Sequence, residues 1–375
     1  MRKLKVVTIV GTRPEIIRLS ALIPKLDRST DHVLVHTGQN SDANLNEVFF
    51  QDLELRPPNL FLNVDTSSMG TVMGDTIRKA EELLAREQPD AVMILGDTNS
   101  SIAAVVAERM HIPVYHMEAG NRSFDANVPE ELNRRMVDHV SSFNLPYNDY
   151  ALRNLLSEGI HPRRISKTGS PIPEVFDNYK EKVHSSDVLR RLDLEARKYI
   201  LVSVHRQENV DFPLRLSAVI QGLVALREHF KLPVLVSTHP RTKARLNLNE
   251  DAELDGILFH DPFGYLDYNK LQMNAFCVVS DSGTISEEAA IQRFPAVSIR
   301  SSIERPEALE AGSIILTGLE PESLVRSVDL ATRSQAISLP EGYETLDFSE
   351  RVLRFLFSTV TLHGQWSGLY ERQKD

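Results

Sequence analysis

The stretch that decides the fold is Leu4–Glu15, which reads LKVVTIVGTRPE. An almost continuous apolar run ends abruptly at Gly11, and Pro14 and Glu15 then follow with the spacing of a helix start. Strands that are apolar along their whole length are typical of parallel sheets covered by helices on both faces. This stretch therefore predicts a strand, a tight turn and a helix at the start of an α/β sheet.

The same alternation continues along the chain in two series. Apolar, strand-like runs occur at Val33–His36, Ala91–Leu95, Pro113–Met117 and Arg164–Thr168, and again at Tyr199–Val204, Pro233–Ser237, Gly256–His260, Phe276–Ser280, Ala296–Ile299 and Ser313–Leu316. Helical spacing lies between them, as in Ile16, Leu19, Ile23 and Leu26. The breaker-rich stretch Gly169–Pro173 separates the two series.

This pattern predicts two Rossmann-like, doubly wound α/β domains. We expect the first over residues 1–170 and the second over residues 171–350. Residues 351–375 continue a helical pattern, and this last helix could cross back to the first domain.

Composition sets limits on partners and location. The chain has 375 residues, 42% of them hydrophobic and 25% charged, with a net charge of -10. An acidic chain argues against non-specific nucleic-acid binding, so an anionic substrate would need a local cluster of basic groups. The N-terminal apolar run is too short for a signal peptide, and no stretch approaches the roughly 20 apolar residues of a membrane helix. We expect a cytoplasmic protein whose single cysteine, Cys277, is a buried small hydrophobe.

Polar and charged groups follow the ends of the predicted strands, where α/β sheets bind ligands. In the first half, Arg13 lies at a helix start, where a guanidinium makes an anion site, and Arg18 lies one turn further. Asp97 follows a buried strand, although helix capping alone would also explain it. Glu118 also follows a hydrophobic strand, where an unpaired carboxylate would be costly.

Another acidic group begins the helical stretch Pro129–Arg134. Glu130 and Glu131 suit the dipole of a helix start. Glu130 and Arg134 are four residues apart on one helix face, so the two side chains could simply pair with each other.

The second half carries two further clusters. His205 directly follows a strand, where a histidine is more often structural, but the adjacent Arg206 and Glu208 raise the chance of a functional role. Small residues at Ser282–Thr284 expose backbone N–H groups at a helix start, a geometry that cradles phosphate. Glu288, one turn into that helix, could accept hydrogen bonds from ribose hydroxyls.

Several cofactor motifs are missing from the sequence. The first strand is not followed by G-x-G-x-x-G, and no G-x-x-x-x-G-K-[ST] occurs. Use of NAD or ATP is therefore poorly supported. No His/Cys spacing suggests zinc, and no G-x-S-x-G nucleophile elbow is present.

Together, the ordered clusters resemble the non-hydrolysing UDP-N-acetylglucosamine 2-epimerase family over roughly residues 4–320. The matching motifs are Gly11–Glu15, Gly96–Thr98, Glu118–Gly120, Pro129–Glu131, Asn133–Arg134, His205–Arg206, Glu208–Asn209, Ser280–Gly283 and Arg305–Glu307. Each motif is weak alone, whereas the ordered set is highly specific.

The resemblance implies a glycosyltransferase-B-like fold, with UDP held in a cleft between two domains. It also implies a reaction without NAD or metal, in which UDP is eliminated and then re-added with inversion at C2. A homodimer fits the family.

Site residues also follow from the resemblance. It makes Asp97, Glu118 and Glu130 the acid–base carboxylates and places His205 near the diphosphate. The other implied contacts with the UDP-sugar come from Arg13, Arg18, Arg134, Arg206, Ser282, Gly283, Thr284 and Glu288.

Departures from the family pattern point to the substrate. The glucosamine enzymes usually carry Ser-Gly-Gly where this chain has Ser282–Thr284, and a Leu before the Arg where it has Asn121. Thr238–Thr242 replaces a His-Pro-Asn-Pro pattern, and Gln39–Asp42 lacks the Gln-His of the bacterial allosteric site.

These departures resemble the branch that converts UDP-2-acetamido-2,6-dideoxy-L-talose to UDP-N-acetyl-L-fucosamine for capsule or O-antigen polysaccharide. UDP-N-acetylglucosamine as substrate is the nearest alternative. A glycosyltransferase, which would share the fold, is the next.

Overall fold

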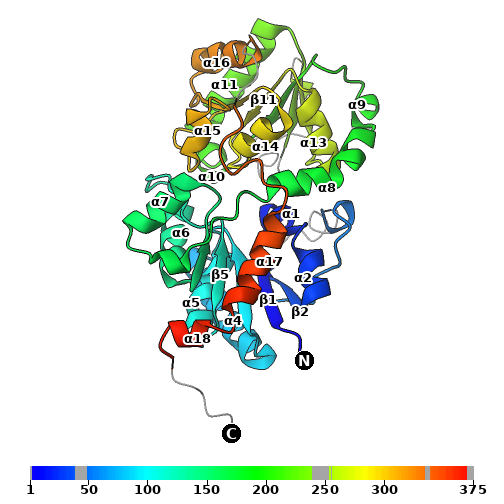
Figure 1. The fold of residues 1–375 in the computed structure, drawn as a ribbon. Coiled ribbons are helices and arrows are strands. Elements are labelled where there is room, and N and C mark those ends of the chain that lie inside the picture. The colour runs from blue at the N-terminus through cyan, green and yellow to red at the C-terminus, as the bar shows by residue number, and fades with distance from the viewer. Residues whose placement is uncertain (1, 39–48, 239–252, 255, 334–337, 370–375) are drawn as a thin grey trace. The chain divides into compact units, whose positions relative to one another are not determined.

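The computed structural model describes residues 2–38, 49–238, 253–254, 256–333 and 338–369 of the chain (Figure 1). The chain divides into two compact units. Unit 1 comprises Met1–Asn178 with Glu344–Asp375, and unit 2 comprises Tyr179–Tyr343. The functional domain limits drawn from the sequence, 1–170, 171–350 and 351–375, stay predictions.

Unit 1 is built on a six-stranded, wholly parallel sheet in the order β3-β2-β1-β4-β5-β6. Its strands are β1 (Lys5–Val10), β2 (Asp31–His36), β3 (Leu60–Phe61), β4 (Ala91–Leu95), β5 (Val114–Met117) and β6 (Phe143–Leu145). The helical segments are α1 (Arg13–Leu19), α2 (Ile23–Ser29), α4 (Met69–Glu87), η1 (Asn99–Ile102), α5 (Ala103–Arg109), α6 (Pro129–Val140), α7 (Asp149–Ser157), η2 (Pro162–Arg164), α17 (Phe348–Thr359) and α18 (His363–Trp366). Helix α8 (Ile172–Ser185) contains the limit between the units.

Unit 2 has a seven-stranded sheet in the order β13-β12-β11-β7-β8-β10-β9, in which only β9 is antiparallel. Its strands are β7 (Ile200–Ser203), β8 (Val234–Ser237), β9 (Glu253–Leu254), β10 (Ile257–His260), β11 (Cys277–Ser280), β12 (Ala296–Ser298) and β13 (Ile315–Leu316). Its helices are α9 (Val188–Arg191), α10 (Gln207–Val210), α11 (Pro213–Phe230), α13 (Tyr265–Asn274), α14 (Ile285–Gln292), α15 (Pro306–Glu310) and α16 (Pro321–Arg333).

The apolar strand runs are explained by helices on both faces of the sheet. In β7, Ile200 and Val202 pack in one buried cluster, while Leu201 packs in another with residues of α13 and α14. Because successive side chains of a strand point to opposite faces, both sets must be apolar when both faces are covered. The predicted α/β class is confirmed in both sheets.

The strand order shows where each unit should bind a ligand. Unit 1 has the 3-2-1-4-5-6 order of a Rossmann sheet, and unit 2 repeats it when β9 is set aside. From β1 the chain adds strands first on one side and then on the other, so the strand order switches between β1 and β4. In unit 2 the same switch lies between β7 and β11. Ligands bind outside the carboxyl ends of strands at such switch points.

The sequence reading of strands was wrong at one place. Arg164–Thr168 was expected to be a strand, but the structure has only an isolated bridge between Asn144 and Ile165. Ser166 and Thr168 donate backbone N–H groups to β6 and to the residue after it, at 3.0 Å each. The short strands β3, β6 and β9 were not predicted, because two or three residues carry too little periodicity.

The last described helices belong to unit 1. Figure 1 shows α17, in red, lying along the sheet of that unit. The Tyr115 hydroxyl is 2.7 Å from the Thr359 hydroxyl, and Phe355 packs edge-on against Phe143. None of the described helices is long and apolar enough to span a membrane.

Candidate functional site

Glu15 connects the turns after β1 and β4, which flank the switch point of unit 1. Its Oε2 accepts the backbone N–H groups of Gly11 and Thr12, the latter at 2.9 Å. Its Oε1 accepts the hydroxyls of Thr98 at 2.5 Å and Ser100 at 2.9 Å. Burial raises the pKa of Glu15 in spite of these four hydrogen bonds. The carboxyl group therefore does more than cap α1, because it fixes two strand-end turns to each other.

Glu118 lies directly after β5 in a left-handed backbone conformation, with φ of 65°. Its Oε2 forms an ion pair with the Arg18 guanidinium, and both side chains are buried. Asn121 Nδ2 lies 3.5 Å from the other oxygen. A Cβ atom at Gly96 would lie only 3.6 Å from Oε2. Glu118 is thus held against the turn that follows β4, in a conformation that non-glycine residues rarely adopt.

Asp97 lies in that turn and is bound by Arg134. The guanidinium donates from both Nε, at 2.9 Å, and Nη2 to Asp97 Oδ2, and from Nη1 to Glu131 Oε2 at 2.7 Å. Although burial raises the pKa of Glu131, the hydrogen bonds from Ser123 and the charge of Arg134 outweigh it and lower that pKa. Arg134 therefore joins the turn after β4 to the start of α6.

The pairing suggested between Glu130 and Arg134 is not what the structure shows. Arg134 binds Asp97 and Glu131 instead. Glu130 is half-buried, and its carboxylate has no ion-pair partner in the part of the chain that the structure describes.

A buried network of hydrogen bonds and ion pairs holds the turns at the carboxyl edge of the unit 1 sheet. His116 Nε2 lies 2.8 Å from the Gly96 carbonyl oxygen, and its Nδ1 lies 2.9 Å from Asp138 Oδ1. Asp138 also accepts the Gly120 N–H and the Arg122 guanidinium, the latter at 2.7 Å. Burial opposes ionisation of Asp138, but His116 and Arg122 outweigh it and lower the pKa. One carboxylate therefore fixes the turns on both sides of Glu118.

In unit 2, the fully buried carboxylate of Asp281 orders the loops at the switch point. Asp281 follows β11 and accepts the backbone N–H groups of His205 and Arg206, at 3.1 and 3.0 Å, and the Asn209 amide at 2.9 Å. His205 Nδ1 lies 3.2 Å from Asp281 Oδ1. A carboxylate at Nδ1 favours the tautomer with its proton there, which makes Nε2 the nitrogen that exchanges a proton.

Arginine side chains surround the loop that follows Asp281. Arg206 Nε donates to the Asp281 carbonyl at 3.0 Å, and Arg305 Nε donates to the Gly283 carbonyl at 3.1 Å. A Cβ atom at Gly283 would lie 2.9 Å from Glu304 Oε1 and 3.6 Å from Arg206 Nη2. An added methyl group at this position would therefore have to displace the Glu304 carboxylate.

The remaining predicted contacts lie around α14. The hydroxyls of Ser282 and Thr284 are 3.0 Å apart, and Thr284 immediately precedes the helix. Glu288 accepts a hydrogen bond from Gln272 Nε2 at 2.6 Å, so one of its oxygens is already engaged.

The structure brings the predicted residues together in two groups. Arg18, Asp97, Glu118 and Arg134 are joined by ion pairs and adjoining turns in unit 1, and Arg13 begins α1 with its guanidinium 5.5 Å from the Phe49 ring centre. His205, Arg206, Ser282, Gly283, Thr284 and Glu288 lie at the switch point of unit 2. Predictions on 39–42 and 239–242, and on the Glu208 side chain, fall outside what the structure describes.

Sequence reasoning gave too little weight to the buried acids. Glu15 was interpreted as a helix cap, Glu131 as a helix start, and Asp281 only as part of a motif; Asp138 was not considered. The available signal was position, since Asp281 directly follows an apolar strand and Glu15 lies in the first turn of the helix after one, where a buried carboxylate must find several donors. In the described ranges, no group of three or more His, Cys, Asp or Glu side chains is placed to hold a metal ion.

Comparisons with known proteins agree over nearly the whole chain. A family model described as UDP-N-acetylglucosamine 2-epimerase matches residues 24–356. The solved UDP-N-acetylglucosamine 2-epimerase from Rickettsia bellii is similar at 41% identity, covering 97% of this chain and 99% of that one, with a TM-score of 0.89.

Two further relatives bear on the ligand. The Methanocaldococcus jannaschii enzyme, solved with UDP-GlcNAc and UDP, is 35% identical over 95% of this chain and 100% of its own, with a TM-score of 0.89. UDP-2,3-diacetamido-2,3-dideoxy-D-glucuronate 2-epimerase from Pseudomonas aeruginosa is 32% identical over 86% of this chain and 91% of its own.

The fold extends beyond epimerases. The spinosyn rhamnosyltransferase SpnG is similar with a TM-score of 0.55 at only 10% identity, over 96% of this chain and 100% of that one. The predicted glycosyltransferase-B-like fold is confirmed.

Proposed function

The chain belongs to the UDP-N-acetylglucosamine 2-epimerase family, and we propose that it inverts C2 of a UDP-linked N-acetylated sugar by eliminating UDP and adding it back. As a member of this family it is an isomerase, a UDP-sugar 2-epimerase. The observation that carries the mechanism is the set of acidic side chains at the carboxyl edge of the unit 1 sheet, with cations fixed beside them.

The reaction has two halves. In the first, a base removes the C2 proton, the electron pair of that bond forms the C1–C2 double bond, and the C1–O bond breaks to release UDP. In the second, an oxygen of UDP attacks C1 while an acid delivers a proton to the opposite face of C2. The chemistry needs two acid–base groups and a stabilised diphosphate leaving group.

Unit 1 supplies the acid–base groups. Asp97, Glu118 and Glu130 are the candidates, and they differ in their surroundings. Asp97 and Glu118 are each paired with a guanidinium, from Arg134 and Arg18, whereas Glu130 is not. Because no ion pair in the described residues has to be broken before Glu130 takes up a proton, we assign it as the base that accepts the C2 proton first.

Unit 2 supplies the diphosphate contacts. The backbone N–H groups of Gly283 and Thr284, with the Ser282 hydroxyl, lie at the start of α14, where an anion is stabilised. Arg206 supplies positive charge and His205 a proton for the departing UDP. Asp281 is the positioning residue for both, since it fixes their backbone N–H groups.

The substrate proposal is UDP-2-acetamido-2,6-dideoxy-L-talose, which would give UDP-N-acetyl-L-fucosamine for capsule or O-antigen polysaccharide. It rests on the departures at Asn121 and Thr284 from the glucosamine pattern. UDP-N-acetylglucosamine is the second candidate, favoured by the similarity to the UDP-N-acetylglucosamine 2-epimerases from Rickettsia bellii and Methanocaldococcus jannaschii. The Pseudomonas aeruginosa relative, named for a diacetamido-glucuronate, supports variation of the sugar within the family.

Incubation with each UDP-sugar in D₂O tests reaction and substrate together. The proposed mechanism places one deuterium at C2 of the epimer, without any acceptor, and with UDP-2-acetamido-2,6-dideoxy-L-talose as the faster substrate. Turnover of UDP-N-acetylglucosamine alone would overturn the substrate proposal. Sugar transfer to an acceptor without deuterium at C2 would overturn the mechanism. A homodimer and a cytoplasmic location stay predictions.

A further inference from the structure

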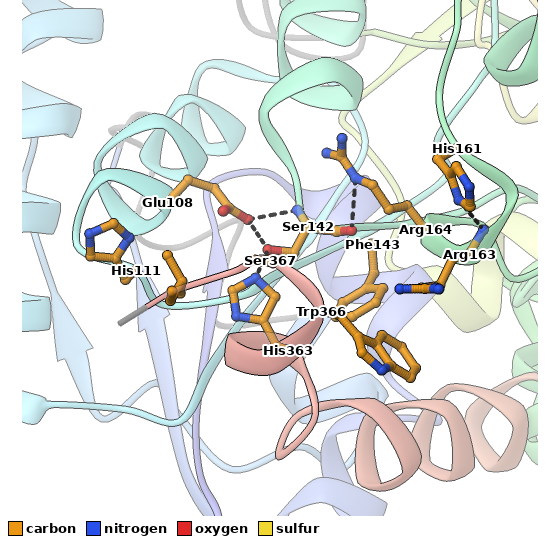
Figure 2. A pocket seen from close by; sticks show the side chains of 11 residues that line it. Glu108, His111, Ser142, Phe143, His161, Arg163, Arg164, His363, Trp366 and Ser367 are labelled. Carbon is orange, nitrogen blue, oxygen red and sulfur yellow. Dashed lines mark hydrogen bonds between the residues drawn. The ribbon is translucent and has the colours of Figure 1, made fainter. Parts of the chain in front are cut away.

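Unit 1 contains a cavity of about 490 Å³ that none of the proposed catalytic groups lines (Figure 2). It is bounded by the end of α5, the start of β6, η2 and α18. Figure 2 shows Arg163, Arg164, His161 and His363 around it, with Trp366 beside Arg163. Small-molecule sites usually have volumes of about 300–1,000 Å³, so the cavity is large enough for a metabolite.

The cavity lies at the opposite edge of the sheet from the proposed catalytic carboxylates. Glu108, in its wall, accepts the backbone N–H of Val114, the first residue of β5, at 3.1 Å. Glu118 follows the last residue of the same strand. Four residues of strand separate the two edges by roughly 13 Å. The cavity is therefore separate from the proposed catalytic site of unit 1.

Positive charge dominates its lining. Two guanidiniums and three imidazoles face one carboxyl group, that of Glu108. Among the described residues neither Arg163 nor Arg164 has a carboxylate partner. Arg164 donates instead to the Ser142 carbonyl at 3.2 Å and the His139 carbonyl at 3.3 Å, and Arg163 lies 5.3 Å from the Trp366 ring centre. In a chain with a net charge of -10, this local excess of cations does not follow from composition.

The one acid is already engaged. Glu108 Oε1 accepts the Ser142 N–H at 2.6 Å and the Ser142 hydroxyl at 2.5 Å, and burial raises its pKa. The Ser142 hydroxyl lies 2.9 Å from His363 Nε2. Burial lowers the pKa of His363, and the positive charges of Arg164 and His111 lower it further. Arg163 and Arg164 therefore bring two guanidinium charges to the cavity, and a bound anion would be stabilised by both.

We propose that this cavity is a binding site for a small phosphate-bearing anion, held by Arg163, Arg164 and His363 at the amino-terminal edge of the unit 1 sheet. Guanidinium groups recognise phosphate with paired N–H donors. The cavity is larger than one phosphate group, which leaves room for the organic part of a metabolite beside Trp366 and Phe143. The site does not depend on the proposed epimerase reaction.

Trp366 gives a direct measurement, because it is the only tryptophan in the chain. The full-length protein is titrated with inorganic phosphate, pyrophosphate and UMP at constant ionic strength, and tryptophan fluorescence is followed. We expect a saturable change, with UMP binding more tightly than phosphate if the organic part is recognised. No saturable change up to ~10 mM, where even a millimolar site would be filled, would overturn the proposal.

Substitutions of Arg163 test whether the fluorescence change comes from an anion bound in the cavity. Arg163→Gln should weaken pyrophosphate binding about tenfold, as loss of one charge-assisted contact would, and Arg163→Lys should weaken it less, because lysine keeps the charge but loses the paired donors. Arg153→Gln is the matched control, because Arg153 is also exposed and lies over a ring, that of Tyr150. Equal affinities for wild type and Arg163→Gln would overturn the proposal. If Arg163→Gln still incorporates deuterium at C2 at the wild-type rate, its loss of anion binding is independent of the proposed epimerase reaction.

Discussion

The switch points of the two units share one topology and differ in where charge is buried. In unit 1, carboxylates and guanidiniums pair across neighbouring turns, as Glu118 does with Arg18 and Asp97 with Arg134. In unit 2, one carboxylate, Asp281, accepts backbone and side-chain N–H groups from the facing loop. Strand order thus predicts where each site lies, whereas the pairing of buried charges determines what each can do.

The difference has a chemical meaning. Paired acids on separate turns provide groups that exchange protons in unit 1, where the Asp138 network supports them. In unit 2, Asp281 orders N–H donors around the anion site, and the buried pairs Arg305–Glu287 and Arg300–Glu304 lie beside it.

Asp138→Asn should destabilise the protein most, by about 3–5 kcal/mol, as loss of one member of a buried ion pair does. Asparagine cannot accept from Arg122, His116 and the Gly120 N–H together. Urea unfolding of both proteins measures the difference. Asp149→Asn, which removes an exposed ion pair with Lys167, is the control and should cost at most about 1 kcal/mol.

The same variant changes the pH dependence of stability. Because the folded-state pKa of Asp138 is lowered, its stabilisation is present above the pKa of an unfolded aspartate and is lost as pH falls through the folded value. Wild type should therefore lose more stability than Asp138→Asn as pH falls below about 4. Parallel pH profiles for the two proteins would contradict the pairing of Asp138.

Glu118→Gln should lower kcat by at least about 100-fold, the usual range for an acid–base group. Glutamine keeps the shape and can still accept from Arg18, so UDP affinity measured by calorimetry should change little. Glu82→Gln, in an exposed ion pair with Arg78, is the control. Near-normal turnover of Glu118→Gln would remove Glu118 from the mechanism and weaken the contrast between the units.

The sequence predicted the elements better than the contacts between them. Continuous apolar runs such as Ala91–Leu95 revealed the central strands, because helices on both faces require apolar residues at every position. The turn residues Asp97, Glu118 and His205 were found for the same reason, since they end such runs.

The side-chain contacts that the sequence did not reveal join residues that are far apart along the chain. Glu15 and Thr98 are 83 residues apart, and Arg18 and Glu118 are 100 apart. Local spacing instead suggested a Glu130–Arg134 pair and a helix cap at Glu15. Only the sheet order brings the true partners onto adjoining turns, and a single sequence carries no direct signal of such pairs.

Asp281→Asn should weaken UDP binding about 10–100-fold, because hydrogen bonds to a charged group contribute about 1.5–3 kcal/mol. The amide cannot accept from His205, Arg206 and Asn209 at once, so their positions become less fixed. Calorimetry with UDP measures the loss, and Asp193→Asn, at an exposed turn of unit 2, is the control. An unchanged dissociation constant would show that this carboxylate does not organise the anion site.

Gly283→Ala should have the smallest of these effects, about a five- to tenfold rise in the UDP dissociation constant, near 1 kcal/mol. The added methyl would meet Glu304 Oε1 at 2.9 Å, and Glu304 also pairs with Arg206 at 3.5 Å. Displacing Glu304 therefore moves a cation of the unit 2 site while leaving the unit 1 acids in place. Gly74→Ala is the control, since nothing lies within 4 Å of its added Cβ and alanine stabilises a helix interior. A loss of kcat in Gly283→Ala with unchanged UDP affinity would contradict the assignment of anion binding to unit 2.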